Sequence, residues 1–313
     1  MRPPEIAVLV PCLDEAATVG QVVDDFRKYI PQARIVVADN GSTDETNKIA
    51  KSHGAQVICE TRPGKGHAVC RMFADVEADF YVLVDGDGTY DASAAPEMLQ
   101  LAIRQSMDMV NGKRVTDGDS TGGEYRSGHR FGNETLTNAF RKLFSLDITD
   151  ALTGYRVMSK RFIKSFPGRS TGFEIETDLN VHAALTGANY CEVPTKYISR
   201  PSSSPSKLNT YKDGWRISMR LFKLFRDFKP ESAFWMFAIP WFAFAAIATI
   251  PILIEYLETG LVPRFPTLIM AAAAFIIGIN LIAAGWVISR IAQVRTEELR
   301  LSYLATPAYS AEP

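Results

Sequence analysis

The sequence has little cysteine and no excess of either charge, and each shortage argues against a class of protein. Its 313 residues include four cysteines that form no CxxC pair, which argues against a disulfide framework and against a zinc site. The 34 basic residues nearly match the 35 acidic ones. This balance argues against a nucleic-acid binder, because phosphate neutralisation needs a basic surplus.

Several segments with known functions are also missing. No GxxxxGK[ST] loop occurs and no GxGxxG follows the first apolar run, so neither a Walker-type phosphate loop nor dinucleotide binding is expected. The apolar stretch in MRPPEIAVLVPCLDE is too short for a signal peptide, and no small-residue cleavage site follows it. We therefore expect the globular part of the chain to stay in the cytoplasm.

Charge is distributed unevenly along the chain. Residues 1–200 hold 23 basic and 27 acidic side chains, residues 201–229 hold 7 and 2, and residues 230–313 hold 4 and 6. A basic collar (residues 201–229) thus joins an acidic globular part to a tail of low charge.

The tail contains two long apolar runs. Ala233 to Ile254 is 22 residues without a charge, and Thr267 to Ser289 is 23. As a helix, either run would extend about 33 Å, enough to cross the hydrocarbon core of a bilayer. The alternative is a pair of buried helices in a large soluble core. Because basic residues flank the runs on the outer sides, we expect two spans, with both termini cytoplasmic, in the inner (cytoplasmic) membrane.

The segment KDGWRISMRLFKLFRDFK (residues 212–229) is amphipathic. Ile217, Leu221 and Phe228 repeat at helical spacing, and Arg216 and Arg220 line another side. This pattern is typical of an interfacial helix on anionic lipid, and the alternative is a helix packed on the protein core. Its position before an apolar run favours the lipid surface.

The first 200 residues alternate strand and helix patterns. Short β-rich runs are predicted as strands at residues 6–10, 35–38, 57–59, 81–84 and 109–110, and residues 19–30, 68–76 and 95–104 have helical spacing. Strands separated by helices of this length predict a mainly parallel sheet, in which ligands bind at the carboxyl ends of the strands.

Polar clusters follow three of these predicted strands: PCLDE at residues 11–15, DNGSTD at 39–44 and DGDG at 85–88. Each alone is ordinary turn chemistry, but together they concentrate carboxylates at one sheet edge, which needs a cation or hydrogen-bond donors. Asp85 and Asp87 offer hard oxygen ligands to Mg²⁺ or Mn²⁺ bridging a diphosphate. Lys65, in a GKG triplet before a helix, is either a phosphate contact or part of a plain loop.

At this point the sequence resembles a known family. The ordered motifs VPCLDEAATVG, VADNGSTDET, RPGKGHAV and VLVDGDGTYD look like the family 2 glycosyltransferases with a GT-A fold, and the resemblance runs over about residues 5–210. It is strongest to the dolichyl- and undecaprenyl-phosphate sugar synthases. The QxxRW motif of processive polysaccharide synthases is missing.

The resemblance implies roles for particular residues. The nucleotide-sugar donor would be bound by Pro11, Leu13, Glu15, Asp39, Lys65 and Asp85, and the divalent metal by Asp85 and Asp87. The phosphate of a polyprenyl-phosphate acceptor would be held by Arg114, Arg126, Arg130, Arg200 and Ser202. Catalysis would then depend on Asp85, Asp87, Arg130 and Arg200.

Two positions depart from the family pattern. Gly88-Thr89-Tyr90-Asp91 follows the DXD motif where many relatives have Leu-Gln, which leaves open whether Thr89 or Asp91 completes the metal shell. Asp14 stands where asparagine is more usual. Further along, Glu174 and Asp178 share one face of a predicted helix, and two like charges there suggest an arginine partner or a site-facing role.

These patterns lead to one expected organisation: a GT-A catalytic domain over residues 1–210, a juxtamembrane helix over 211–231, a transmembrane hairpin over 232–290 and a tail over 291–313. The expected activity is inverting transfer of a sugar, from a UDP-sugar or from GDP-mannose, to undecaprenyl or dolichyl phosphate. The alternatives are a membrane-bound sugar nucleotidyltransferase, a transferase with another lipid or polysaccharide acceptor, and a non-catalytic scaffold. The hairpin also offers surfaces for a homo-oligomer.

Overall fold

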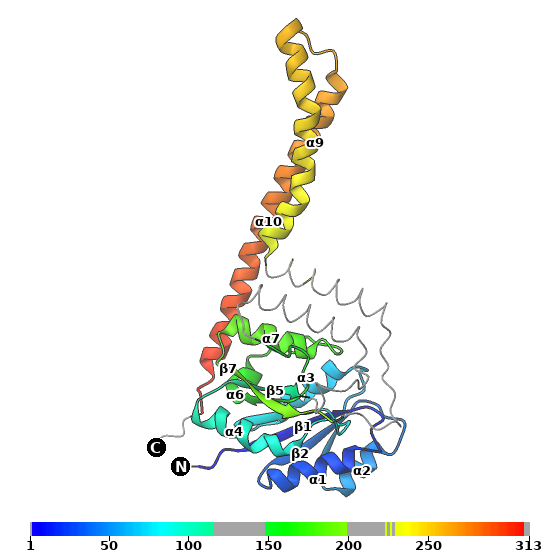
Figure 1. Cartoon of the computed structure of the whole chain (residues 1–313), viewed down its shortest axis with the longest axis vertical. Helices are drawn as coiled ribbons and strands as arrows, with labels where there is room; N and C mark the ends of the chain where they lie inside the picture. Colours follow the sequence, from blue (N-terminus) through cyan, green and yellow to red (C-terminus); the bar gives the residue numbers. More distant parts are fainter. Residues whose placement is uncertain (1, 116–147, 199–222, 224–225, 227–228, 310–313) are drawn as a thin grey trace. The chain divides into compact units, whose positions relative to one another are not determined.

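Figure 1 shows a computed structural model of the chain. It describes residues 2–115, 148–198, 223, 226 and 229–309. The chain divides into two compact units, of which one comprises Met1–Thr210 with Glu298–Pro313 and the other comprises Tyr211–Glu297. The first unit holds a β-sheet and its covering helices, and the second holds the two apolar runs.

The first unit is built on a seven-stranded sheet with the order β3-β2-β1-β4-β6-β5-β7. Among the described strands, β6 runs antiparallel to its neighbours β4 and β5, and the other pairs are parallel. The strands are β1 (Ile6–Cys12), β2 (Arg34–Asp39), β3 (Gln56–Cys59), β4 (Phe80–Leu83), β5 (Met109–Val115), β6 (Arg156–Ser159) and β7 (Tyr190–Lys196). The mainly parallel sheet predicted from the sequence is confirmed, with β6 and β7 as strands that the pattern did not predict.

Helices cover both faces of this sheet (Figure 1), because successive apolar residues of a buried strand point to opposite sides. Val8 and Val10 pack with Phe26 in one core, and Leu9 packs with Met72 and Leu179 in the other. The first core includes α1 (Val19–Tyr29), α2 (Thr46–Ser52) and α4 (Ala95–Arg104), which follows the short η1 (Ala92–Ala94). The second includes α3 (Lys65–Asp75), α6 (Lys160–Lys164) and α7 (Ile175–Thr186).

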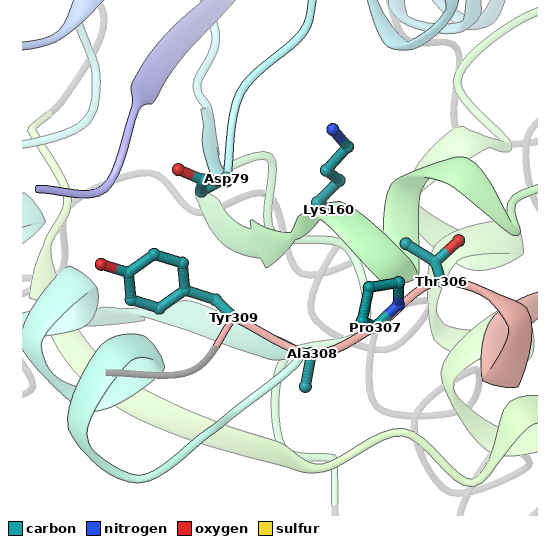
Figure 2. A pocket seen from close by; sticks show the side chains of 6 residues that line it. All are labelled: Asp79, Lys160, Thr306, Pro307, Ala308 and Tyr309. Atoms are coloured by element: carbon teal, nitrogen blue, oxygen red, sulfur yellow. The ribbon is translucent and has the colours of Figure 1, made fainter. Parts of the chain in front are cut away.

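The C-terminal segment returns to the first unit. The Tyr303 hydroxyl donates to Asp108 over 2.5 Å, and the Tyr309 hydroxyl donates to the carbonyl of Arg2 over 3.0 Å. Figure 2 shows a pocket beside this segment, with a volume of about 320 Å³ and lined by Asp79, Lys160 and residues 306–309. Since Asp79 precedes β4, this pocket lies at the sheet edge opposite the carboxyl ends of the parallel strands and includes none of the expected site residues.

The second unit contains α9 (Pro230–Thr259) and most of α10 (Phe265–Ala305). Their most apolar windows have mean hydropathies of 2.2 and 2.3, and only 17% and 22% of those windows is buried. A core helix of a soluble protein would be mostly buried, so these two helices are long and apolar enough to cross a membrane and expose the side chains that lipid would cover. Phe242 and Phe275 join them through an edge-to-face contact, with ring centroids 5.4 Å apart.

The expected juxtamembrane helix and the expected hairpin can be compared with the structure only where residues are described. The juxtamembrane helix expected over 211–231 lies almost wholly outside them. Helix α9 continues through Pro240 and Pro251, and α10 runs on to Ala305, beyond the expected end of the hairpin at residue 290.

Candidate functional site

The carboxyl ends of β1, β2 and β4 bring the three polar clusters together. Cys12, the last residue of β1, is in register with Asp39, the last residue of β2, and the Asn40 amide donates to the Cys12 carbonyl. Asp85 follows β4 by two residues, and the hydroxyl of Thr18, after the first cluster, donates to the Gly86 carbonyl over 2.7 Å. The three clusters therefore form one site, at the edge where parallel sheets bind ligands.

The second cluster is an ordered turn. Asp39 is 8% exposed and accepts hydrogen bonds from the Ser42 amide at 3.0 Å and the Asn47 side chain at 3.2 Å. Asp14, which replaces the usual asparagine, accepts from the Thr43 amide at 2.7 Å, and its own amide donates to the Ser42 hydroxyl. The carboxylate of Asp14 thus joins the first two clusters to each other.

The first cluster provides the remaining residues expected to surround a nucleotide. Pro11 is buried at the end of β1, Leu13 is 44% exposed, and Glu15 accepts a 3.3 Å hydrogen bond from Thr18. A buried ring, an exposed apolar side chain and a carboxylate therefore lie in sequence beside Asp39.

The DXD segment (residues 85–87) packs closely against a glycine, Gly154. A Cβ at Gly154 would lie 2.5 Å from Oδ2 of Asp85, closer than a carbon and an oxygen can approach, and the Gly154 amide donates to the Tyr90 hydroxyl at 2.8 Å. The segment DALTGYR (residues 150–156) therefore provides the surface against which Asp85 packs.

Thr89 and Asp91, between which the sequence leaves the metal-shell residue open, make different hydrogen bonds. The buried Thr89 hydroxyl donates to Oδ1 of Asp87 over 2.6 Å. Asp91 instead accepts from the Ser93 amide and forms the N-cap of η1. Of the two, Thr89 is the residue in contact with the DXD carboxylates.

Lys65 lies deep in the site. Its Nζ is 2.5 Å from Oδ1 of Asp85 and 2.5 Å from Oε1 of Glu176, and the three side chains are 11%, 24% and 8% exposed. Burial alone would lower the pKa of Lys65, but the two carboxylates raise it well above its usual value. The pKa of Glu176 is raised by burial, and Lys65 opposes that rise only in part. The 2.5 Å contact between Nζ of Lys65 and Oε1 of Glu176 has the geometry of an ion pair.

Glu176 was missed by the sequence pattern, which pointed to Glu174 and Asp178. In the structure these two bind the segment before α7: Glu174 accepts from Thr171, and Asp178 accepts from the Ser170 hydroxyl at 2.7 Å. Glu176, two residues from each of them, lies on the opposite side of the helix and contacts Lys65 in the site. Helical spacing reports only neighbours on the same helix, and the partner of Glu176 lies 111 residues away.

Arg156, on β6, holds the DALTGYR segment and α7 together. Its side chain is fully buried and donates to Asn180 over 2.6 Å and to three backbone carbonyls, those of Thr153, Ala151 and Glu176. Burial lowers the pKa of this guanidinium. A buried arginine with this many acceptors stabilises a defined backbone arrangement beneath the site.

The arginines expected to hold an acceptor phosphate are only partly described. Arg114 makes a two-point ion pair with Asp150, with both N–O distances 2.7 Å, and its guanidinium lies 5.6 Å from the Tyr197 ring centroid. Arg126, Arg130, Arg200 and Ser202 lie outside the described residues.

Comparisons with known proteins identify relatives of this chain. The model of the family described as "Glycosyl transferase family 2" matches residues 7–165. "Glycosyltransferase AglJ" of Haloferax volcanii is 34% identical over 222 residues, which cover 71% of this chain and 72% of the relative. "Dolichyl-phosphate hexose transferase" of the same organism is 28% identical over 221 residues, which cover 70% and 93%.

Solved structures share the fold. The glucosyl-3-phosphoglycerate synthase of Mycobacterium tuberculosis superposes with a TM-score of 0.56 at 21% identity, over 71% of this chain and 80% of that one. The same enzyme was crystallised with Mn²⁺ and UDP-glucose, and that structure gives a TM-score of 0.54 at 21% identity over 71% and 78%. At this identity the likeness establishes the fold, a GT-A-like α/β architecture.

Proposed function

The chain belongs to glycosyltransferase family 2, and from that membership we propose that it is a membrane-bound inverting enzyme that transfers a sugar from a nucleotide sugar to a polyprenyl phosphate. The observation that carries the proposal is the convergence of Lys65, at the start of α3, with the Asp85-Asp87 segment after β4, at the sheet edge where Asp39 ends β2. A divalent cation and an ammonium both offset the negative charge of a nucleoside diphosphate.

The residues present fit a divalent cation. Asp85 and Asp87 provide two carboxylates, and Mg²⁺ and Mn²⁺ typically take one or two carboxylates and complete their shell with phosphate oxygens and water. No group of three His, Cys, Asp or Glu side chains in metal-ligand positions occurs within the described ranges, which suits a site that the donor itself completes. When bound, the ion would offset the charge of the departing diphosphate.

The donor would enter over the first two clusters. Leu13 provides exposed apolar surface for a base, while Asp39 and Glu15 provide acceptors for base and ribose N–H and O–H groups. We favour a UDP-sugar, with GDP-mannose as the other candidate, and the support is the fold neighbour crystallised with UDP-glucose.

The acceptor would be a lipid monophosphate, as the name of the dolichyl-phosphate relative suggests. A phosphate is already an anionic nucleophile at neutral pH, so the chain needs no strong general base and instead must align two anions. We assign that alignment to Arg114, Arg126, Arg130, Arg200 and Ser202. Direct displacement by the phosphate inverts the anomeric centre.

The apolar helices support a lipid acceptor. Their exposed apolar side chains and lengths fit a two-span hairpin, with the catalytic domain and both termini in the cytoplasm by the charge asymmetry of the flanks. An enzyme held in the same bilayer as its acceptor searches in a plane instead of a volume.

The test uses the detergent-solubilised full chain with Mn²⁺ or Mg²⁺ and radiolabelled UDP-glucose, UDP-GlcNAc, UDP-galactose or GDP-mannose. We expect one donor to label undecaprenyl or dolichyl phosphate, while the corresponding polyprenol without phosphate stays unlabelled. Release of pyrophosphate from a nucleotide and a sugar phosphate would instead indicate the nucleotidyltransferase alternative. Labelling only of another lipid or a polysaccharide would change the acceptor.

A matched pair of variants separates the enzyme from a scaffold. Asp85→Ala with Asp87→Ala removes both proposed metal carboxylates, whereas Asp91→Asn changes a nearby acid that caps η1. Transfer should disappear in the first and persist in the second. Unchanged transfer in the double variant would contradict the proposal.

A further inference from the structure

The buried ion pairs around Lys65 do more than occupy space, because Lys65 competes directly with any metal ion at Asp85. The ammonium is 2.5 Å from a carboxylate oxygen that the proposed function assigns to a divalent cation. Two cations at one carboxylate repel each other, so a lysine in this position weakens metal binding unless another anion takes part of its charge.

Glu176 is that anion. Its carboxylate contacts the same ammonium at 2.5 Å from the side of α7, and with 8% exposure it is shielded from solvent. The fold holds this contact rigidly, because the carbonyl of Glu176 accepts from Arg156 at 3.1 Å and the helix is bound through Asn180 to the same arginine.

The lysine is held equally firmly from the side of α3. The Gly64 amide donates to the Asn40 side chain over 2.7 Å. A Cβ at Gly64, whose φ is +123°, would lie 2.1 Å from the Thr171 carbonyl oxygen, so the helix start packs tightly against the segment before α7. The backbone from which Lys65 extends is therefore fixed, and its ammonium lies between two carboxylates with the side chain only 11% exposed, so its charge must be balanced there.

The charges around Asp85 determine how strongly it attracts a cation. Lys65 carries one positive charge and contacts two carboxylates, so Glu176 offsets the ammonium and leaves the charge of Asp85 to a divalent cation. Removing the charge of Glu176 makes the surroundings of Asp85 one unit more positive, and removing that of Lys65 makes them one unit more negative. In a site this poorly solvated, each change alters the affinity for a cation.

We propose that Glu176 is a positioning residue that neutralises Lys65 and thereby sets the divalent-metal affinity of the DXD carboxylates. This inference rests on the proposed function, since it takes Asp85 and Asp87 as the metal ligands. It predicts opposite effects for its two members: Glu176→Gln weakens metal binding and Lys65→Met strengthens it. The double variant, in which both charges are gone, binds metal as the unmodified chain does.

The experiment measures Mn²⁺ binding to the full chain in detergent, by electron paramagnetic resonance of free Mn²⁺, with and without UDP. We expect the dissociation constant to rise about tenfold in Glu176→Gln and to fall by a similar factor in Lys65→Met, as one charge at short range in a partly buried site implies. In Lys65→Met/Glu176→Gln it should return to within about threefold of the starting value, because the two charge changes cancel.

Glu174→Gln is the matched control, because it removes a carboxylate two residues away that binds Thr171 and does not contact Lys65. Its Mn²⁺ affinity should be unchanged. Circular dichroism checks that each variant is folded.

A purely structural role would make both single variants weaker and the double variant weakest, and that result would overturn the inference while leaving the transferase proposal intact. If the unmodified chain transfers sugar but binds no Mn²⁺ with or without UDP, the metal assignment and this inference both fail.

Discussion

Two buried carboxylate clusters lie at opposite edges of the same sheet, and they differ in charge balance. Asp108, just before β5, is 1% exposed and accepts from the Arg161 guanidinium, the hydroxyls of Ser159 and Tyr303 and the Asn189 amide. One acid there meets one base and several neutral donors. In the other cluster, one base contacts two acids, because Lys65 is ion-paired with both Asp85 and Glu176.

Charge balance distinguishes a structural carboxylate from one in a functional site more clearly than burial does, because both clusters are buried. A carboxylate whose acceptors are filled by its own chain gains stability from being buried, as at Asp108. A cluster with excess negative charge is costly unless a ligand neutralises it, which is why such clusters mark functional sites.

The largest effect should follow from Asp85→Ala with Asp87→Ala. Removing both carboxylates eliminates the groups that hold the diphosphate's counter-ion, so transfer should fall by at least about a thousandfold, as losses of transition-state charge stabilisation do. The thermal midpoint should stay equal or rise, since repulsion is relieved. Radiolabel transfer to polyprenyl phosphate and a thermal melt of the same preparation measure the two quantities.

Asp108→Asn should show the opposite behaviour. It leaves Arg161 without its buried counter-charge, and removing one member of a buried pair costs about 3–5 kcal/mol of unfolding free energy. Transfer per folded molecule should be unaffected. Urea denaturation followed by circular dichroism gives the free energy, and a stable but inactive variant would contradict the distinction between the two edges.

Acid should destabilise the first unit in two steps that different residues control. Burial lowers the pKa of His182 to about 4, so the stability it contributes is complete above pH 6.5 and is lost as the pH falls towards 4. The loss amounts to about 3 kcal/mol over that window, at up to ~1.4 kcal/mol per pH unit. His182→Gln should remove this slope.

The second step belongs to Asp108. Burial would raise the pKa of Asp108, but Arg161, Tyr303 and Ser159 together lower it below its usual value. A depressed carboxyl pKa stabilises the fold above the unfolded pKa of about 3.9 and loses that contribution at lower pH. Free energies of unfolding between pH 3 and 8 therefore separate the two groups, and a single slope that His182→Gln leaves unchanged would show the assignment to be wrong.

The smallest effect should come from Tyr303→Phe. It removes one hydroxyl donor to Asp108 but keeps the ring beneath the Arg161 guanidinium, 4.7 Å from the ring centroid. The expected cost is about 1 kcal/mol, the usual net value of one hydrogen bond, measured by urea denaturation. Tyr309→Phe, which loses a bond to the exposed Arg2 carbonyl, is the control and should cost less.

Sequence patterns predicted those parts of the fold and of the site that depend on neighbouring residues in the chain. The continuous apolar runs of β1, β2 and β4 identified the centre of the sheet, and the carboxylates that follow them identified the site edge. Strand β6 is short and begins with a charged residue, and its place between β4 and β5 depends on antiparallel pairing with residues far away in the sequence. No local pattern carries that information.

The same limit explains the site residues that the sequence did not reveal. Arg156 has a charged side chain, which a sequence pattern would place at the surface. It is buried because four acceptors, two from the segment before β6 and two from α7, bind its guanidinium. Lys65 was expected to contact the donor, and its two carboxylate partners became visible only when α3 and α7 were packed together. Contacts across 20 and 111 residues cannot be predicted from helical or strand spacing.

The hydrogen bond between Tyr309 and Arg2 also has a topological consequence. Two residues in contact share one compartment, so if the apolar helices cross a bilayer as proposed, the number of crossings between Arg2 and Tyr309 is even. Under that proposal a single crossing is incompatible with this hydrogen bond, without reference to flanking charges. If α9 enters the membrane and leaves on the far side, α10 has to bring the chain back.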